Sequence, residues 1–476
     1  MKRGEIITIK IDDYAFGGKG IGRIATEKGN FVVFVEQAIP GQTVEAMVIK
    51  ARKNHAECAL KRVISRSADE MVTAFQPVSG APYITLPLEI QHRYKIESVF
   101  QLFTRIGAVE SVAARFDELI PSPESHFYRN KVEYSFSTIR YDQESMHESD
   151  DDFALGYKSR GTWWRVENLD RPGGLFDEAF ENFVPKIREY LKSTGLPAWH
   201  PPQKKGFFKH LVLRKSFADD KLLIGLVTSN EGISDFDSAN FADFLKSNLG
   251  NRLAGVLHAS NDETSDRDKV ANGNTRLLCG EPNIREQIFG LGFEISMESF
   301  FQTNPRCAEK LYERAIQYTL LEAPKAGEVV LDLFCGTGTI GQILGKKIPG
   351  IQVIGVDIVE SAIEDAKGNA RRNNVSNVEF VAEDAGKFLS ARPELKGKIH
   401  TVVLDPPRAG IAPKSLLKVI ALGARQLVYI SCNPATQARD IKELEAGGYA
   451  LQKFSLVDQF PHTSHIETVA LFQRTQ

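Results

Sequence analysis

Cys432 is the residue whose position most directly suggests chemistry. It lies in YISCNPATQARD (429–440), after an apolar run that predicts a buried strand and before a helical pattern. A helix start and nearby basic groups lower the pKa of a thiol from its free value of about 8.5, and the resulting thiolate is a nucleophile. Such a thiolate can add to C6 of a pyrimidine ring and make C5 reactive toward an electrophilic methyl group. The alternative is that Cys432 is an ordinary core residue at a strand end.

A covalent adduct of this kind needs a base that removes the C5 proton, so that the thiolate can leave. The segment PHTSHIETVALF (461–472) offers Glu467 at the start of the last apolar run of the chain. His462 and His465 compete for the role, and we expect them instead to be hydrogen-bonding partners within the loop. The sequence therefore predicts Cys432 and Glu467 as a neighbouring nucleophile and base.

A glycine-rich turn after the apolar run VVLDLF predicts a cofactor site. Gly336, Gly338 and Gly341 form a G-x-G-x-x-G, and Asp357 ends the next predicted strand. Glycines let the backbone approach a ligand closely, and an acid at the second strand tip can accept hydrogen bonds from both ribose hydroxyls. The pattern fits NAD and S-adenosylmethionine alike. Asp332 favours S-adenosylmethionine, because a carboxylate before the turn repels a pyrophosphate and suits the cationic methionine end.

Two further acids end neighbouring predicted strands. Asp384 ends the run VEFVAED and is placed to meet the edge of an adenine. Asp405 ends the run HTVVLD, where Pro406 and Pro407 restrict the backbone and hold the carboxylate at the mouth of the pocket. Ligands of α/β sheets bind beyond the carboxyl ends of the strands, so we expect all these residues beside one site.

Residues 291–476 are predicted to form the domain that positions this chemistry. From about residue 327, strand patterns alternate with helical patterns, which requires right-handed crossovers and a parallel sheet covered on both faces. The last two runs, KFSLVDQF and ETVALFQR, are joined by a short loop and should close the sheet as an antiparallel hairpin. The prediction is a Rossmann-like α/β fold.

Two regions precede this domain. Residues 1–64 alternate short β-rich runs with Gly-rich turns, which predicts a small antiparallel barrel whose basic tail suits RNA phosphates. A barrel used only for packing is the alternative. Residues 65–290 mix strands and helices without a clean period, so we expect a central α+β region of unassigned topology, part of which is free to pack with the catalytic domain.

Two central segments mix basic and aromatic residues, and we expect them to contact RNA. They are FYRNKVEYSF (127–136) and KKGFFKHLVLRK (204–215). Cations follow a phosphate backbone and aromatic rings stack on unpaired bases, although such mixtures are also common on ordinary sheet edges. The rings in question are Tyr128, Tyr134, Phe207 and Phe208.

Composition sets the outer limits. The chain has 476 residues, 42% of them hydrophobic, and a formal net charge of −2, so no global basic signature marks a nucleic-acid binder. We find neither a membrane-spanning run nor a signal peptide, and we expect a cytoplasmic protein. The five cysteines are scattered, which argues against a disulfide framework, a zinc site or a cluster. No metal is expected.

These residues resemble one family, the RNA uracil-5-methyltransferases, which act on 23S ribosomal RNA or on the T-loop of transfer RNA. The N-terminal barrel looks like the TRAM domain that many members carry. The matching segments are FFQTN (300–304), DLFCGTG (332–338), DPPRAG (405–410), SCNPAT (431–436), PHTSHIET (461–468) and FYRNKVEYSF (127–136).

The resemblance implies Cys432 as nucleophile and Glu467 as base. It implies that the S-adenosylmethionine pocket is lined by Gln302, Phe334, Asp357 and Asp405, and it places a polar cofactor contact at Asp384.

The resemblance also bears on the RNA and on rival functions. Ribosomal members often hold an iron-sulfur cluster through four cysteines, but the corresponding stretch near 77–87 has none, so we expect no cluster. The TRAM-like module favours ribosomal over transfer RNA. A cytosine-5 enzyme would need a second cysteine in DPPRAG, and an amino-group enzyme would not need Cys432. The remaining alternative is a noncatalytic RNA-binding assembly factor. We expect a monomer.

Overall fold

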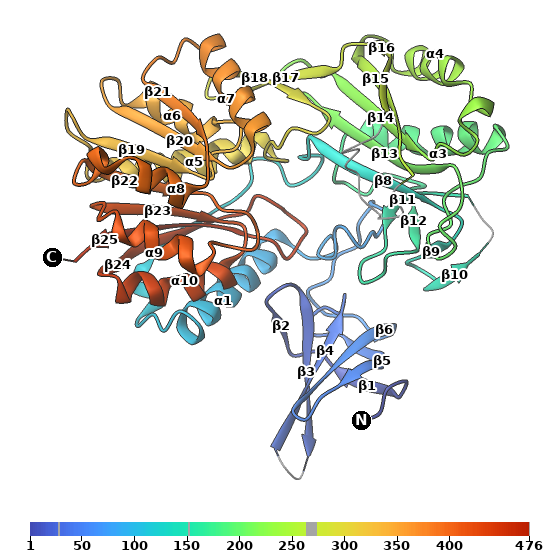
Figure 1. The fold of residues 1–476 in the computed structure, drawn as a ribbon. Helices are drawn as coiled ribbons and strands as arrows, with labels where there is room; N and C mark the ends of the chain where they lie inside the picture. Colours follow the sequence, from blue (N-terminus) through green and yellow to red (C-terminus); the bar gives the residue numbers. More distant parts are fainter. Residues whose placement is uncertain (27–28, 151–152, 263–273, 476) are drawn as a thin grey trace.

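The computed structural model describes residues 1–26, 29–150, 153–262 and 274–475. Figure 1 shows a small β-domain below two larger lobes, with the central region on one side and the catalytic sheet on the other. Across the described residues, no helix combines the length and the apolar character that crossing a membrane requires.

The N-terminal domain is a curled sheet with a small core of its own. We expected an antiparallel barrel, and most neighbouring strands are antiparallel, with a core between them. One pair is parallel, because the strand that lies between its two members in the sequence pairs with the other edge of the second member. The sheet order is β1 (Ile6–Lys10), β5 (Thr43–Ala51), β6 (His55–Ser65), β4 (Gly29–Glu36), β3 (Lys19–Thr26) and β2 (Asp13–Ala15), and β4 and β6 are the parallel pair.

The central region is built on a nine-stranded mixed sheet, the topology that the sequence left unassigned. Helices α3 (Glu178–Ser193) and α4 (Ser238–Leu249) pack on it through a large aromatic and aliphatic core. The sheet order is β10 (His147–Ser149), β9 (Arg140–Asp142), β12 (Val166–Asn168), β11 (Ala154–Lys158), β8 (Lys131–Ser137), β13 (Phe208–Lys215), β14 (Leu222–Thr228), β15 (Leu253–Ser260) and β16 (Asn274–Gly280).

The catalytic sheet confirms the Rossmann-like prediction. Five strands are parallel, and the last two form the antiparallel hairpin. The sheet order is β21 (Val378–Ala382), β20 (Gln352–Asp357), β19 (Val329–Leu333), β22 (Ile399–Leu404), β23 (Gln426–Ser431), β25 (Glu467–Arg474), β24 (Tyr449–Val457) and β7 (Phe116–Ile120). Its helices are α5 (Pro305–Leu320), α6 (Thr339–Lys347), α7 (Glu360–Arg372), α8 (Ala385–Ala391), α9 (Pro413–Ala421) and α10 (Pro434–Ala446).

Elements from the central part of the sequence complete this sheet. Strand β7 pairs with β24 at its edge, and α1 (Leu88–Arg105) packs against α10 below it (Figure 1). The short helix α2 (Val112–Arg115) connects these two elements, and the hairpin of β17 (Asn283–Ile288) and β18 (Leu291–Ser296) leads into α5. The segment that ends at Glu467 is therefore enclosed by chain from distant parts of the sequence.

Candidate active site

The turn after β19 has the shape of a cradle for a ligand. Phe334 adopts φ 65°, a left-handed conformation that is unusual for a bulky residue, and Gly336 follows at φ 51°. A side chain added at Gly336 would meet nothing within 4 Å, so the backbone faces open space there. Gly338 is different, because a side chain there would collide with Phe380. The first glycine thus leaves room for a ligand and the second permits packing.

Asp332 lies beneath this turn and does not face solvent. One carboxylate oxygen accepts a hydrogen bond from the Gly341 amide at 2.8 Å, and the other has no partner among the described residues. Burial, then the charges of Asp405 and Asp357, raises the pKa of Asp332 to about 8. A cationic ligand above the turn would stabilise the ionised form, so Asp332 fits S-adenosylmethionine through its charge rather than by direct contact.

The next two strand tips carry the predicted acids. Asp357 ends β20, and its carboxylate is fixed by the amides of Gly336 and Val359, each at 2.9 Å. The neighbouring Ile358 and Val359 side chains are 73% and 50% exposed, an apolar surface suited to a flat ring. Asp384 follows β21 and caps α8 by accepting from the Lys387 amide. These residues fit an adenosine group at the edge of the sheet.

Cys432 and Glu467 are brought together by strand register. Strands β23 and β25 are antiparallel, and Ser431, the last residue of β23, pairs with Thr468. Cys432 and Glu467 are the residues that adjoin this last pair, and the charge of Glu467 acts on the Cys432 thiol. Side chains directly opposite each other on antiparallel strands have Cβ atoms about 4.5–5.5 Å apart, close enough to act on one ring. Asp405 ends the neighbouring strand β22.

Gln302 reaches the same region from the loop before α5. Its carbonyl accepts from the Asn130 side chain at 3.1 Å, and its side-chain oxygen lies 3.4 Å from Gln459 Nε2. The buried Tyr312 of α5 lies against Gln302, and its pKa is raised by burial and by the charge of Asp405. Sequence reasoning missed Tyr312, whose only signal is a polar hydroxyl on the buried face of an amphipathic helix.

Comparison with known sequences decides the family. The sequence model of the TRAM domain matches residues 1–60, and that of the tRNA (Uracil-5-)-methyltransferase family matches residues 283–475. An uncharacterized RNA methyltransferase of Clostridium acetobutylicum is 35% identical over 483 residues, covering 100% of this chain and 99% of the relative. The chain belongs to the RNA (uracil-5-)-methyltransferase family. The predicted reaction class, S-adenosylmethionine as cofactor, and the TRAM domain are thereby confirmed.

Two further matches extend this result. A second RNA methyltransferase, from Caldanaerobacter subterraneus subsp. tengcongensis, is 34% identical and covers 100% of both chains. Among solved structures, the Pyrococcus abyssi tRNA (uracil-54, C5)-methyltransferase in complex with S-adenosyl-L-homocysteine superimposes with a TM-score of 0.70 at 24% identity. That match covers 98% of this chain and 100% of the other, and it shows that the two share the whole three-part fold.

The electrostatics of the methyltransferase site differ from our expectation for the thiol. We predicted a lowered pKa for Cys432, but burial, then the charges of Glu467 and Asp405, raises it to about 12. Arg408 acts in the opposite direction and is outweighed. The prediction was wrong because it counted the helix start and the basic groups but neither the burial of the thiol nor the two carboxyl groups beside it.

The carboxylates of the site are perturbed in the same direction. Burial, then the charge of Asp405, raises the pKa of Glu467 to about 8, and burial raises that of Asp405 to about 7. Like charges that share a desolvated pocket favour protonation. In the free enzyme, Glu467 therefore holds its proton more firmly at neutral pH than Asp405 does.

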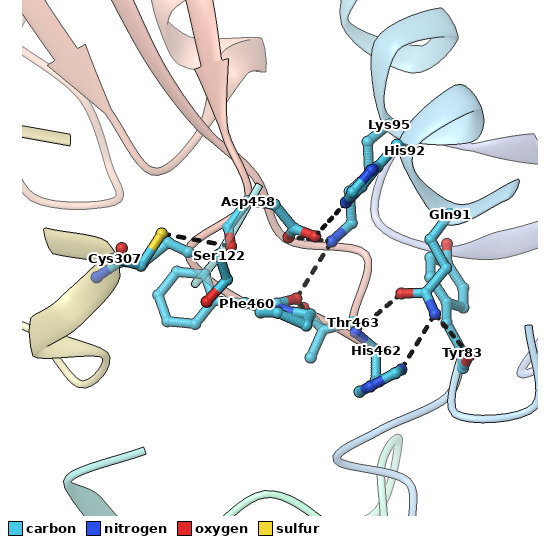
Figure 2. A network of polar contacts seen from close by, with 12 residues as sticks. Tyr83, Gln91, His92, Lys95, Ser122, Cys307, Asp458, Phe460, His462 and Thr463 are labelled. Atoms are coloured by element: carbon cyan, nitrogen blue, oxygen red, sulfur yellow. Dashed lines mark hydrogen bonds and ion pairs between the residues drawn. The ribbon is translucent and has the colours of Figure 1, made fainter. Parts of the chain in front are cut away.

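The loop before Glu467 is fixed by a buried polar network (Figure 2). Asp458 is fully buried and accepts from Lys95 at 2.5 Å and His92 at 2.9 Å, both on α1. Gln91, on the same helix, contacts both the amide and the ring of His462. This helix was not among the predicted site elements, and it positions the loop that leads to Glu467.

The two loop histidines are neutral at physiological pH. Burial, then the cationic neighbourhood, lowers the pKa of His465 to about 4, and burial, then His126, lowers that of His462 to about 3. His462 packs on His126 with ring centroids 4.3 Å apart, and His465 lies 3.4 Å from an Arg408 nitrogen. Both act within hydrogen-bonding networks, as the sequence suggested.

The aromatic residues expected to stack on RNA do not reach the surface. All four are core residues of the central sheet, so their rings cannot meet a base, and the alternative reading of these segments as ordinary strands is correct. The four rings are Tyr128, Tyr134, Phe207 and Phe208, each at most 1% exposed.

Within the described part of the chain, no group of three or more His, Cys, Asp or Glu side chains could hold a metal ion.

Proposed function

We propose that the enzyme methylates C5 of a uridine in RNA through a covalent bond between Cys432 and C6. The observation that carries the proposal is the β23–β25 register, which ends at Ser431 and Thr468 and so leaves Cys432 and Glu467 next to each other at the carboxyl edge of the sheet, where the charge of Glu467 acts on the thiol. A nucleophile and a buried carboxylate with a pKa raised to about 8 form a matched pair for addition and proton removal.

The reaction follows from these positions. As Cys432 Sγ bonds to C6, its proton passes to the ionised carboxylate of Asp405, which leaves Glu467 free to act later, and the C5–C6 electron pair moves toward C5 and O4. Bound S-adenosylmethionine supplies an electrophilic methyl group, and C5 takes it. Glu467 then removes the C5 proton, the C5–C6 double bond forms again, and the thiolate leaves. Arg408, whose charge opposes the raised pKa of Cys432, stabilises the anionic sulfur at the start and end.

We propose that the cofactor lies across the tips of β19, β20 and β21. Asp357 would bind the ribose hydroxyls, and Asp384 would face the adenine edge. Phe334, Gln302 and Asp405 would line the methionine end, with the last two also close to the target base. This arrangement is supported by the open space at Gly336 and by the exposed apolar pair beside Asp357.

The methyltransfer chemistry is tested with RNA carrying tritium at C5 of uridine. We expect Cys432→Ala to release no tritium and to retain its affinity for RNA. Glu467→Gln should methylate once and remain covalently bound to the RNA, because the C5 proton stays in place. Tritium release by Cys432→Ala at the wild-type rate would contradict the proposal.

We propose 23S ribosomal RNA as the substrate, because the chain carries the TRAM domain. Transfer RNA is the second candidate, since an enzyme named for tRNA uracil-54 shares the fold over its whole length. We further propose a cytoplasmic monomer, because one chain supplies Gln302, Cys432 and Glu467 together. Mapping 5-methyluridine in ribosomal and transfer RNA from a strain that lacks the gene separates the two substrates.

A further inference from the structure

Three parts of the chain meet beside the loop that leads to Glu467. The guanidinium of Arg160, between β11 and β12 of the central region, donates to the carbonyl of Gly17 in the TRAM domain at 2.5 Å. A side chain added at Gly18 would collide with Ser464 of the catalytic loop. Tyr83 donates its amide to the carbonyl of His462 in that same loop. The turn of the TRAM domain therefore lies against the loop that leads to Glu467.

An exposed tryptophan lies in the same loop as Arg160. Trp163 follows Arg160 by three residues and is 53% exposed, although burying an aromatic ring is favourable. Its loop is ordered by hydrogen bonds: the Ser159 amide donates to the Arg165 carbonyl at 3.0 Å, and the Trp164 carbonyl accepts from Ser137 Oγ at 2.9 Å. The Trp164 ring supports that of Trp163 edge to face, with centroids 5.7 Å apart. The exposed ring is thus presented in a fixed place.

The TRAM side of the junction carries a second exposed ring. Phe16, immediately before Gly17, is 37% exposed. The Arg160–Gly17 hydrogen bond therefore has an exposed aromatic residue on each of the two segments that it joins. Exposed rings on two segments that a cation joins match the combination of aromatic and basic side chains that binds unpaired bases and their backbone.

The charge of the junction is positive. Arg160 has no ion pair with a carboxylate among the described residues, and its guanidinium keeps donors that the Gly17 carbonyl does not use. Its charge, with that of Arg408, contributes to the lowered pKa of His465, so both cations act at the active-site loop. A guanidinium that is free of carboxylates and close to a nucleotide site matches a phosphate.

We propose that Trp163, Arg160 and Phe16 form a platform for an unpaired stretch of the substrate RNA beside the target uridine. Trp163 stacks on a base and Arg160 contacts a backbone phosphate, so the TRAM domain and the central region hold the RNA together. The inference rests on the proposed function in that the RNA bound here is the one that Cys432 attacks.

Binding of a labelled oligouridine of about 12 nucleotides, measured by fluorescence anisotropy without cofactor, tests the platform. We expect Trp163→Ala to weaken binding about tenfold or more, as loss of one stacked base does, and Trp163→Phe to retain most of the affinity. Leu321→Ala is the matched control, because Leu321 is 58% exposed and follows α5 at the opposite edge of the sheet. It should bind as the wild type does.

A duplex RNA of the same length separates stacking from charge. Trp163→Ala should leave duplex binding unchanged, because paired bases are not available to the ring, whereas Arg160→Ala should weaken binding to both probes. Unchanged oligouridine affinity in Trp163→Ala, an equal loss on the duplex, or a wild-type protein that does not bind oligouridine would overturn the proposal. Repeating the series in Cys432→Ala separates it from the chemistry, since stacking persists there even if the proposed methyl transfer is wrong.

Discussion

Replacing Glu467 by Gln should stabilise the enzyme while stopping its turnover. Glu467 is 3% exposed, and burial with the neighbouring Asp405 raises its pKa from the ordinary 4.5 to about 8. The folded state therefore binds a proton that the unfolded state has released at neutral pH. The free energy of unfolding therefore falls as the pH rises from 4.5 to about 8, because over this range only the folded protein holds the extra proton. Glutamine has no proton to lose, so the penalty disappears.

The size of the effect follows from the two pKa values. At 1.36 kcal/mol per pH unit between 4.5 and 7, the penalty at pH 7 is roughly 3 kcal/mol, and at pH 5 it is under about 1 kcal/mol. It levels off above pH 8, where the folded state also loses the proton. In a domain of this size, a gain of about 3 kcal/mol raises the melting temperature by about 6–12 °C.

The assay is the melting temperature of Glu467→Gln minus that of the wild type, measured from pH 5 to pH 8. Glu443→Gln is the matched control, because Glu443 is exposed on α10. We expect a difference that grows with pH for Glu467→Gln and a flat one for the control. A difference that is constant with pH, or that shrinks as pH rises, would refute the assignment of a protonated carboxyl group at this position.

Three other outcomes follow from the same geometry. The rate at which tritium is released from C5 of uridine should rise between pH 6 and pH 9 with an inflection near 8, because Glu467 must be ionised to remove the C5 proton; a release rate that falls over this range contradicts that role. Lys95→Met should lower the free energy of unfolding by about 3–5 kcal/mol, because it leaves Asp458 buried without the lysine. Denaturant titration should show that the double variant Lys95→Met/Asp458→Leu recovers part of this free energy. Gly336→Ala should weaken S-adenosylmethionine binding, measured by calorimetry, far more than Gly327→Ala does. Gly327 also has a positive φ and open space around it, but no ligand is expected there, so equal losses would argue against the cradle.

The catalytic sheet was predictable because its signals are local. Each apolar run ends at a glycine, an acid or the cysteine, and the carboxyl ends of parallel strands must meet at one edge. Asp357, Asp384, Asp405, Cys432 and Glu467 are all found at strand tips or one or two residues beyond them. The parallel order then required only the usual right-handed crossovers.

What the sequence did not reveal depends on contacts between distant segments. The pKa of Cys432 is raised because the fold buries the thiol and places two carboxyl groups beside it, and no local pattern in the sequence reports either effect. Lys95 and Asp458 lie 363 positions apart and pair only after α1 packs under the sheet. Tyr134 lies in a segment whose composition suggests base stacking, but the alternation of side chains along β8 points its ring into the core.

The covalent adduct tests the central claim most directly. The enzyme is incubated with S-adenosylmethionine and RNA that carries 5-fluorouridine, whose C5 fluorine Glu467 cannot remove, and the protein is then denatured and digested. We predict a stable complex in which mass spectrometry locates a methylated fluorouridine on the peptide that contains Cys432. An adduct on another residue, an adduct that persists in Cys432→Ala, or methylated RNA without any adduct would contradict the account.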